Sequence, residues 1–330
     1  MNGHQVDGVL VQWGERLFYP SNRIVKSPPT PRLDTLMRRK AAVIRQRIEA
    51  TVRRAPQVMV KVTGGGRGMA AIAAHFSYIS KNGRLDIEDD REVMRNGKEA
   101  VRDLVDQWRY GGSRIEDESH RREAFNVMLS MPAGTNAELL KKAVREFAQV
   151  ELAGHRYVMV MHEHQANPHV HLSVKAEGIS GMRLNPRKAD LQRWRETFAE
   201  KLRGWGIEAE ATRQATRGEN RSYESLWRLK ARQEGRLRAQ PAMPERGLIA
   251  SRGRADAMVN WAHILKALAA SEVDGYRELG KRVGSFVRSS TVFKETMHHR
   301  RGQEALISWE AAEHKRRDTS KNRTDRTPSR

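Results

Sequence analysis

Hydrophobic and polar positions between residues 57 and 218 follow two different patterns. Short apolar runs rich in β-branched residues predict strands, and apolar residues three or four positions apart predict helices. The strands are expected at residues 57–63, 124–130, 156–162 and 169–175, with a short edge strand at 181–186. The helices are expected at residues 69–83, 99–108, 137–152 and 188–204.

The two ends of the chain lack this alternation. Residues 1–56 are interpreted as a basic N-terminal arm, in which a Pro-rich stretch precedes a basic helical segment at 33–54. The basic side chains of that segment either face solvent or contact the phosphates of a nucleic acid directly. Residues 219–313 are helical and basic, and 314–330 contain almost no apolar residues, so we expect a disordered basic tail. Residues 57–218 are the expected core domain.

Three histidines are expected to converge where strands 156–162 and 169–175 form a hairpin across an Asn-Pro turn. Strand side chains alternate between faces, so His169 and His171 point the same way. Antiparallel pairing brings His162 close to them. Because imidazole nitrogen is a common ligand of Zn²⁺, Mn²⁺, Co²⁺ and Ni²⁺, the hairpin predicts a metal site. The alternative is that each is an ordinary hydrogen-bonded strand residue.

Charge and composition narrow the class of protein. The 61 Lys and Arg against 40 Asp and Glu give a net charge of +21 and a pI near 10.7. This excess indicates a polyanionic partner, first nucleic acid and otherwise an anionic membrane surface. The absence of cysteine excludes disulfides, thiolate metal sites and cysteine nucleophiles. With no bilayer-spanning apolar run and no signal-peptide pattern, we expect a cytoplasmic protein without membrane insertion.

The helix expected at 69–83 follows a glycine-rich turn that contains Arg67. The turn matches neither nucleotide-phosphate loop pattern, so we interpret it as letting the backbone approach DNA or a neighbouring element. Tyr78 falls opposite the apolar stripe of this helix, which favours an accessible phenol. Acidic residues at 88–90 and 116–118 are interpreted as solvated surface rather than metal ligands.

Three motifs occur in the order found in relaxases of conjugative or mobilisable plasmids, which are HUH-type tyrosine endonucleases. Residues 76–83, Phe-Ser-Tyr-Ile-Ser-Lys-Asn-Gly, resemble the first motif, whose tyrosine is the nucleophile. Residues 129–135, Leu-Ser-Met-Pro-Ala-Gly-Thr, resemble the second, associated with DNA positioning near the nick. Residues 162–171, with their His-x-His ending, resemble the histidine metal motif. The resemblance covers about Gln57 to Gly218 and is close to the transfer-DNA border nicking endonucleases.

This resemblance implies an α+β fold with a palm-like antiparallel sheet flanked by helices. It implies that Tyr78 attacks a phosphodiester of single-stranded origin DNA and forms a 5′-phosphotyrosyl intermediate. It also implies Mg²⁺ or Mn²⁺ held by His162, His169 and His171. The residues assigned to DNA binding are Ser130, Thr135, Arg67, Arg213 and Arg217. The implied partners are origin-of-transfer DNA, relaxosome accessory proteins and the type IV secretion coupling protein, in a bacterial cytoplasm.

The sequence departs from the family pattern at two positions. His164 stands where an acidic residue usually orients the metal ligands. The usual asparagine after the last histidine is missing, with Lys175 in that region. Either His164 assists removal of the phenol proton, or a carboxylate comes from elsewhere, or activity is weakened.

The leading hypothesis is a metal-dependent relaxase that makes a site- and strand-specific nick for conjugative transfer, with Tyr78 and His164 as catalytic residues. The alternatives are a rolling-circle replication initiator, which shares the chemistry, and a DNA-binding accessory protein that has lost cleavage. A general hydrolytic metalloenzyme leaves the charge unexplained. We interpret the tail at 314–330 as a signal to the secretion channel.

Overall fold

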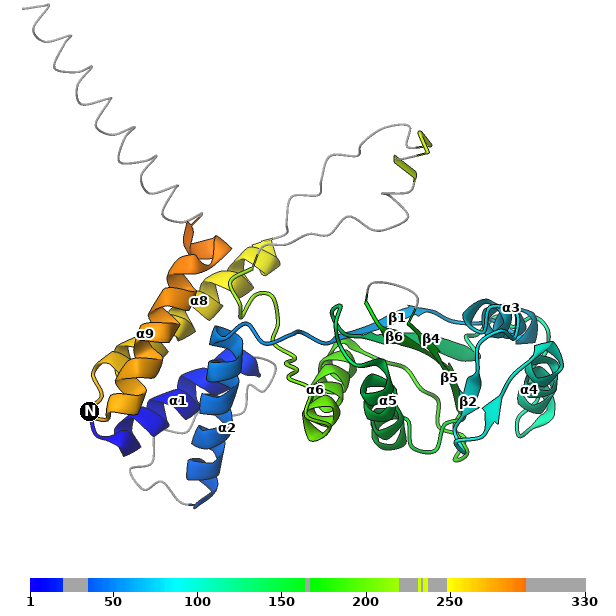
Figure 1. The fold of residues 1–330 in the computed structure, drawn as a ribbon, viewed down its shortest axis with the longest axis horizontal. Helices are drawn as coiled ribbons and strands as arrows, with labels where there is room; N and C mark the ends of the chain where they lie inside the picture. Colours follow the sequence, from blue (N-terminus) through cyan, green and yellow to red (C-terminus); the bar gives the residue numbers. More distant parts are fainter. Residues whose placement is uncertain (20–34, 164–166, 220–230, 233, 237–247, 295–330) are drawn as a thin grey trace, which may run out of the picture. The chain divides into compact units, whose positions relative to one another are not determined.

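A computed structural model describes the chain in two compact units (Figure 1). One unit is Arg53–Ala211, and the other combines Met1–Val52 with Thr212–Arg330. The described residues are 1–19, 35–163, 167–219, 231–232, 234–236 and 248–294. The segments on either side of the first unit thus contribute to one helical unit, and the division into four separate regions stays a prediction.

The unit at Arg53–Ala211 is built on a six-stranded antiparallel sheet with strand order β1-β4-β6-β5-β2-β3. β5 and β6 form the expected hairpin, and β4 pairs with the other edge of β6. The strands are β1 (Met59–Gly64), β2 (Ile87–Asp89), β3 (Met94–Arg95), β4 (Ala124–Ser130), β5 (Tyr157–His162) and β6 (His169–Lys175). The predicted α+β class is confirmed.

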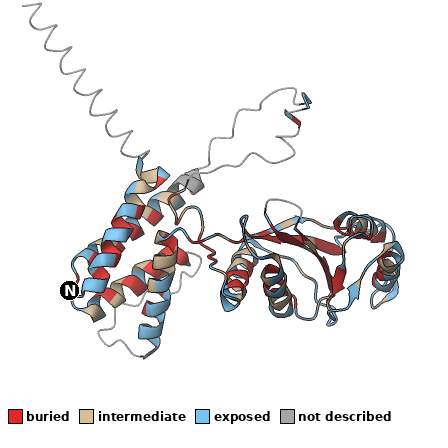
Figure 2. Cartoon of the chain, viewed as in Figure 1, coloured by how far each residue is buried: buried red, intermediate tan, exposed pale blue. Residues whose placement is uncertain are grey.

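Helices cover both faces of this sheet (Figure 1). They are α3 (Met69–Ile79), α4 (Lys98–Tyr110), α5 (Ala137–Glu151) and α6 (Lys188–Gly204). Along β5 the side chains alternate between two cores: Tyr157 and Met159 pack with α5 and α6, whereas Val158 and Val160 pack with α3 and α4. The inner strands β4, β6, β5 and β2 are accordingly buried along most of their length (Figure 2). His162 continues the second series, which directs it to the face that α3 covers.

The path of α3 brings its last turn to the end of the sheet where the histidines lie. β1 begins with Met59 opposite Ser130 and ends with Gly64 opposite Asn126, so the chain leaves the sheet at the far end. The 11 residues of α3 then span about 16 Å, close to the length of the neighbouring strands. Tyr78 is therefore carried back over the site.

The glycine-rich turn before α3 contacts another segment of the same unit. The amides of Met69 and Ala70 donate to the carbonyls of Glu116 (2.8 Å) and Asp117 (3.2 Å). Gly68 has a φ of 96°, and a Cβ there would collide with the Asp117 carbonyl. The turn thus lets the backbone approach a neighbouring element, and the first amides of α3 already have partners.

The acidic residues at 88–90 correct one expectation. Glu88 is 1% exposed and Asp89 is 7% exposed, so the solvated-surface interpretation was wrong for both. The Glu88 carboxylate accepts hydrogen bonds from Arg145 (2.5 Å) and lies 3.1 Å from Lys141. Both cations belong to α5, more than 50 residues further along the chain. The sequence around Glu88 therefore gives no sign of this pairing. The cluster at 116–118 is exposed, as expected.

The prediction of a short edge strand at residues 181–186 was also wrong. The structure has a single antiparallel bridge between Glu177 and Arg183 there. A tight turn replaces the strand, in which the Gly181 amide donates to the Gly178 carbonyl at 2.9 Å. The segment is therefore a hairpin-like loop after β6.

The helical unit has its own apolar core. Its helices are α1 (Gly3–Phe18), α2 (Thr35–Val52), α8 (Leu248–Ala269) and α9 (Asp274–Ser289). Val6, Leu10, Ile48, Trp261 and Val283 are among the buried residues that pack together. The Pro-rich stretch at 27–31 and the tail at 314–330 lie outside the described residues. Among the described helices, none combines the length and the apolar character that a membrane crossing needs.

Candidate active site

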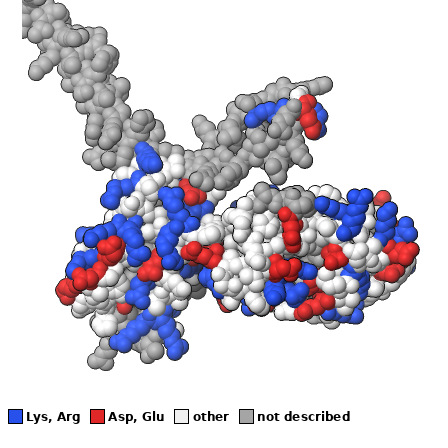
Figure 3. All heavy atoms as spheres, in the orientation of Figure 1, with Lys and Arg blue, Asp and Glu red and all other residues white. Residues whose placement is uncertain are grey.

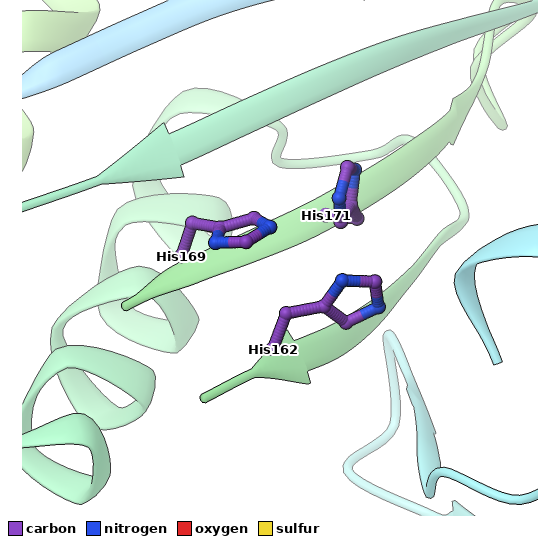
Figure 4. A group of neighbouring side chains, drawn as sticks. All are labelled: His162, His169 and His171. Atoms are coloured by element: carbon purple, nitrogen blue, oxygen red, sulfur yellow. The ribbon is translucent and has the colours of Figure 1, made fainter. Parts of the chain in front are cut away.

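The three histidines predicted as metal ligands converge on the face of the sheet that α3 covers. His162 ends β5, and His169 and His171 lie at the start of β6 with their rings turned toward one another (Figure 4). The ring centroids are 4.6, 5.0 and 5.1 Å apart. One nitrogen of each ring lies within 4.8 Å of the others. A single ion can therefore contact all three imidazoles after small side-chain movements.

Main-chain carbonyls fix the orientation of two of these rings. Nε2 of His162 lies 2.6 Å from the Ile79 carbonyl, and Nδ1 of His169 lies 3.0 Å from the Asn167 carbonyl. A carbonyl only accepts, so these nitrogens donate, and the lone pairs remain on Nδ1 of His162 and Nε2 of His169. Metal-binding histidines are generally oriented by such outer hydrogen bonds. The backbone thus performs part of the role for which the resemblance suggested a carboxylate.

The third imidazole is electrically neutral. Burial, together with the neighbouring rings of His162, His169 and His75, lowers the pKa of His171 to about 3. Only a neutral imidazole binds a metal. The donor set, three imidazoles of which two have an outer nitrogen bound to a carbonyl, therefore fits a divalent ion.

Tyr78 lies in the last turn of α3, next to this cluster. Its side chain is 71% exposed, in agreement with the accessible phenol expected from the helix pattern, and its ring centroid is 6.5 Å from that of His171. The chain turns sharply after the helix through Lys81, Asn82 and Gly83, whose φ angles are 51°, 59° and 79°. This Asn-Gly stop fixes the end of the helix that carries the phenol.

One residue of the site was not predicted from the sequence. His75 lies one helical turn before Tyr78, with its ring centroid 6.3 Å from Tyr78 and 6.4 Å from His171. Burial lowers the pKa of His75 to about 4. Its Nε2 is buried without a hydrogen-bond partner in the described part of the chain. The three-residue spacing to Tyr78 was the available signal, since such residues share a helix face.

Two residues predicted to bind DNA lie after β4. Ser130 pairs with His169 across β4 and β6, and its buried hydroxyl donates to the Pro168 carbonyl at 3.1 Å. The Thr135 hydroxyl donates to the Pro132 carbonyl at 2.8 Å, while Asn136 is the N-cap of α5. Ser130 is therefore part of the histidine end of the sheet. The DNA contacts of both residues stay predictions.

The other predicted residues are placed away from the cluster or lie in the other unit. Arg67 is exposed before the first residue of α3, about a helix length from Tyr78. Arg213 and Arg217 belong to the helical unit, where Arg217 forms an ion pair with Glu219 at 3.1 Å. Their contacts with DNA stay predictions. His164 lies outside the described residues, and its catalytic role stays a prediction as well.

Comparison with known proteins shows which family part of this chain resembles. Residues 78–207 match the family model described as relaxase, MobA/VirD2-like, nuclease domain, and the match begins at Tyr78 itself. Over this segment the chain is similar to the relaxases, close to the VirD2 family.

Curated relatives agree with that assignment. The chain is 25% identical over 183 residues to the T-DNA border endonuclease VirD2 of Rhizobium radiobacter, covering 49% of this chain and 43% of the relative. It is 24% identical over 210 residues to the protein of the same name from Agrobacterium fabrum, covering 56% and 47%. The Rhizobium rhizogenes protein is 24% identical over 183 residues, covering 49% and 42%. The chain spans less than half the length of these relatives.

Proposed function

We propose that this protein nicks one strand of DNA at the transfer origin of a mobile element and stays attached to the new 5′ end through Tyr78. The observation that carries the proposal is one juxtaposition. The ring centroid of the exposed Tyr78 lies 6.5 Å from the ring centroid of His171. His171 belongs to the three-histidine cluster, and both residues lie in the segment that matches the relaxase nuclease domain. The large positive charge of the chain agrees with a DNA substrate.

In the proposed reaction, the Tyr78 oxygen attacks the scissile phosphorus, and the bond from phosphorus to the 3′ oxygen breaks. The products are a 5′-phosphotyrosyl ester and a free 3′-hydroxyl. Because the ester retains the phosphoryl bond, the reverse attack by a 3′-hydroxyl reseals the strand. The phenol must lose its proton during the attack, and His164 is the proposed acceptor.

His162, His169 and His171 are proposed to hold Mg²⁺ or Mn²⁺. When bound, such an ion would neutralise charge on the phosphate oxygens. The chain keeps these side chains in place: Ile79 and Asn167 accept hydrogen bonds from two of the rings. Removing these constraints would let the rings rotate away from one another.

The substrate and partners follow from the same proposal. The VirD2 relatives are named as endonucleases of T-DNA borders, which favours transfer over replication as the purpose of the nick. We therefore propose single-stranded origin DNA as the substrate, and relaxosome accessory proteins and the type IV secretion coupling protein as partners, in a bacterial cytoplasm. Loss of transfer with normal replication after gene deletion would separate this function from that of a rolling-circle initiator.

The test uses single-stranded oligonucleotides tiled across the replicon that carries the gene, with Mg²⁺ or Mn²⁺. The wild-type protein is expected to form an SDS-resistant protein–DNA adduct, and Tyr78→Phe is expected to form none. Tyr110→Phe is the matched control, because Tyr110 is 65% exposed at the end of α4 in the same unit. An adduct that persists in Tyr78→Phe would refute the nucleophile assignment. Tight binding without any adduct would support a non-cleaving protein.

A further inference from the structure

His75 is a buried polar residue of the site that the proposed reaction does not yet use. Its Nε2 is buried and has no hydrogen-bond partner among the described residues. Leaving such a group unpaired destabilises the folded state, so native proteins rarely do so without a reason. The reason is often a catalytic role or a ligand. The position of the ring indicates which ligand.

The rings of His75, Tyr78 and His171 form a nearly equilateral triangle. The three centroid distances are 6.3, 6.4 and 6.5 Å. In the proposed reaction the scissile phosphate has to lie between the Tyr78 oxygen and the histidine cluster that includes His171. His75 is the third corner, so its ring borders the place where the non-bridging oxygens of that phosphate must lie.

We infer that His75 is a further catalytic residue, whose Nε2–H donates a hydrogen bond to a non-bridging oxygen of the scissile phosphate. The inference rests on the proposed function, because it requires Tyr78 to attack that phosphate. Tyr78 is the movable neighbour: its ring stacks on His75, yet most of its side chain is exposed. Rotation of the phenol into line with the phosphorus is expected to uncover Nε2.

The chemistry of the ring suits this role. Negative charge develops on the phosphoryl oxygens during attack, and a donor already fixed in place stabilises that charge without reorganisation. A neutral imidazole is an effective hydrogen-bond donor to a developing oxyanion. The position of His75 on helix α3, one turn from Tyr78, keeps the backbone of the donor residue at a constant distance from the backbone of the nucleophile.

Side-chain replacements separate this role from packing. Glutamine places an amide N–H close to the position of Nε2, asparagine places it close to Nδ1, and leucine fills space without a donor. In single-turnover cleavage of the oligonucleotide that the wild-type protein nicks, we expect His75→Gln to keep most of the rate. His75→Asn and His75→Leu are expected to lose about 100-fold or more. His120→Leu, which removes an exposed histidine of the same unit, is the matched control.

Sulfur substitution of the scissile phosphate tests the contact itself. Sulfur accepts hydrogen bonds poorly, so one phosphorothioate diastereomer is expected to slow the wild-type protein and His75→Gln, but not His75→Leu, which has no donor to lose. Equal rates for wild type and His75→Leu would overturn the inference while leaving adduct formation by Tyr78 intact. Weaker Mn²⁺ binding by His75→Leu, measured by calorimetry, would also overturn it in favour of a metal-binding role. Absence of any wild-type adduct would instead refute the proposed function.

Discussion

The hydrogen bond from His162 to Ile79 joins the three-histidine cluster on the sheet to α3, the helix that carries Tyr78. Ile79 directly follows Tyr78, and its carbonyl is one of those that an α-helix leaves without an intrahelical partner. Nε2 of His162 donates to it at 2.6 Å. One contact therefore orients a candidate ligand and anchors the last turn of α3, so the backbone that carries Tyr78 is held next to the histidines before DNA arrives.

Loss of one candidate ligand should weaken metal binding strongly. In His169→Ala the cluster keeps two imidazoles, and we expect the affinity for Mn²⁺ to fall by about 100-fold or more, since even outer hydrogen-bond partners contribute about 10–100-fold. Isothermal titration calorimetry at neutral pH measures the change. His120→Ala, at an exposed position of the same unit, controls for general loss of histidine. Equal affinity of His169→Ala and wild type would exclude the cluster as the metal site.

At the scale of elements, the far end of β6 is tied to the end of α4 by a buried lysine. Nζ of Lys175 donates to the carbonyls of Trp108 (3.4 Å), Gly111 (3.2 Å) and Ser113 (3.0 Å). A cation suits this position because carbonyls at a helix C-terminus carry partial negative charge. The residue that departs from the family pattern thus has a structural role here, away from the histidine end of the sheet.

Replacement of this lysine should loosen the segment after α4. Lys175→Met keeps the apolar length but leaves three carbonyls without their donor, and we expect a loss of about 1–3 kcal/mol in the free energy of unfolding. Hydrogen exchange should become faster at residues 108–115, while Mn²⁺ binding is unchanged. Lys98→Met, at the exposed start of α4, is the matched control. Unchanged exchange in Lys175→Met would contradict the role of this contact.

The unit Arg53–Ala211, which contains the segment similar to relaxase nuclease domains, is called the nuclease unit below. Its long helices and strands can be predicted from local sequence patterns, and its short strands cannot. Four strands and four helices were predicted within a few residues, because apolar periodicity is clear over six residues or more. β2 and β3, of three and two residues, are too short to show a period. α1 was missed although Asn2 and Gln5 form a capping box, a signal that was present in the sequence.

In the candidate active site too, some features depend on local sequence and others on residues distant in the chain. The convergence of the three histidines depends on a hairpin and on strand alternation, both of which are local. The burial of His75 and Glu88 depends on elements distant in sequence: His75 contacts His171 of β6, and Glu88 is paired by Arg145 and Lys141 of α5. No local pattern contains such partners, which explains why these two residues were overlooked or misread.

At the scale of the whole molecule, most of the positive charge lies outside the nuclease unit. Residues 53–211 contain 26 Lys and Arg against 22 Asp and Glu, whereas the rest of the chain contains 35 against 18, or +17 of the total +21. Figure 3 shows Lys and Arg over much of the visible face of the helical unit. Attraction to a polyanion is therefore expected mainly from that unit.

Helix α2 separates its basic and apolar sides. Ala41, Ile44 and Ile48 are buried, while Arg38 and Arg39 are exposed. The sequence left two interpretations open for these arginines, a solvated face or direct contact with phosphate. Both agree with an exposed side chain, so only the response of DNA binding to salt distinguishes them.

A salt titration of the full-length chain decides between these interpretations. If Arg38 and Arg39 each neutralise a phosphate, replacing both by Ala should lower the slope of log affinity against log salt by about 1.4, at about 0.7 per contact with single-stranded DNA. Fluorescence anisotropy with an oligonucleotide of unrelated sequence measures this slope. The matched variant Arg277→Ala/Lys281→Ala removes the same charge, but these side chains already form ion pairs with Asp274 and Glu278.

The comparison of the two double variants separates local contact from net charge. Equal changes in both would mean that only the total charge of the helical unit matters, and no change in either would assign the arginines of α2 to a solvated face. A change confined to Arg38→Ala/Arg39→Ala would make α2 a phosphate-binding surface. In that case the positively charged helical unit would hold the DNA strand by its backbone, and the nearly balanced charge of the nuclease unit would leave the choice of phosphate to the geometry around Tyr78.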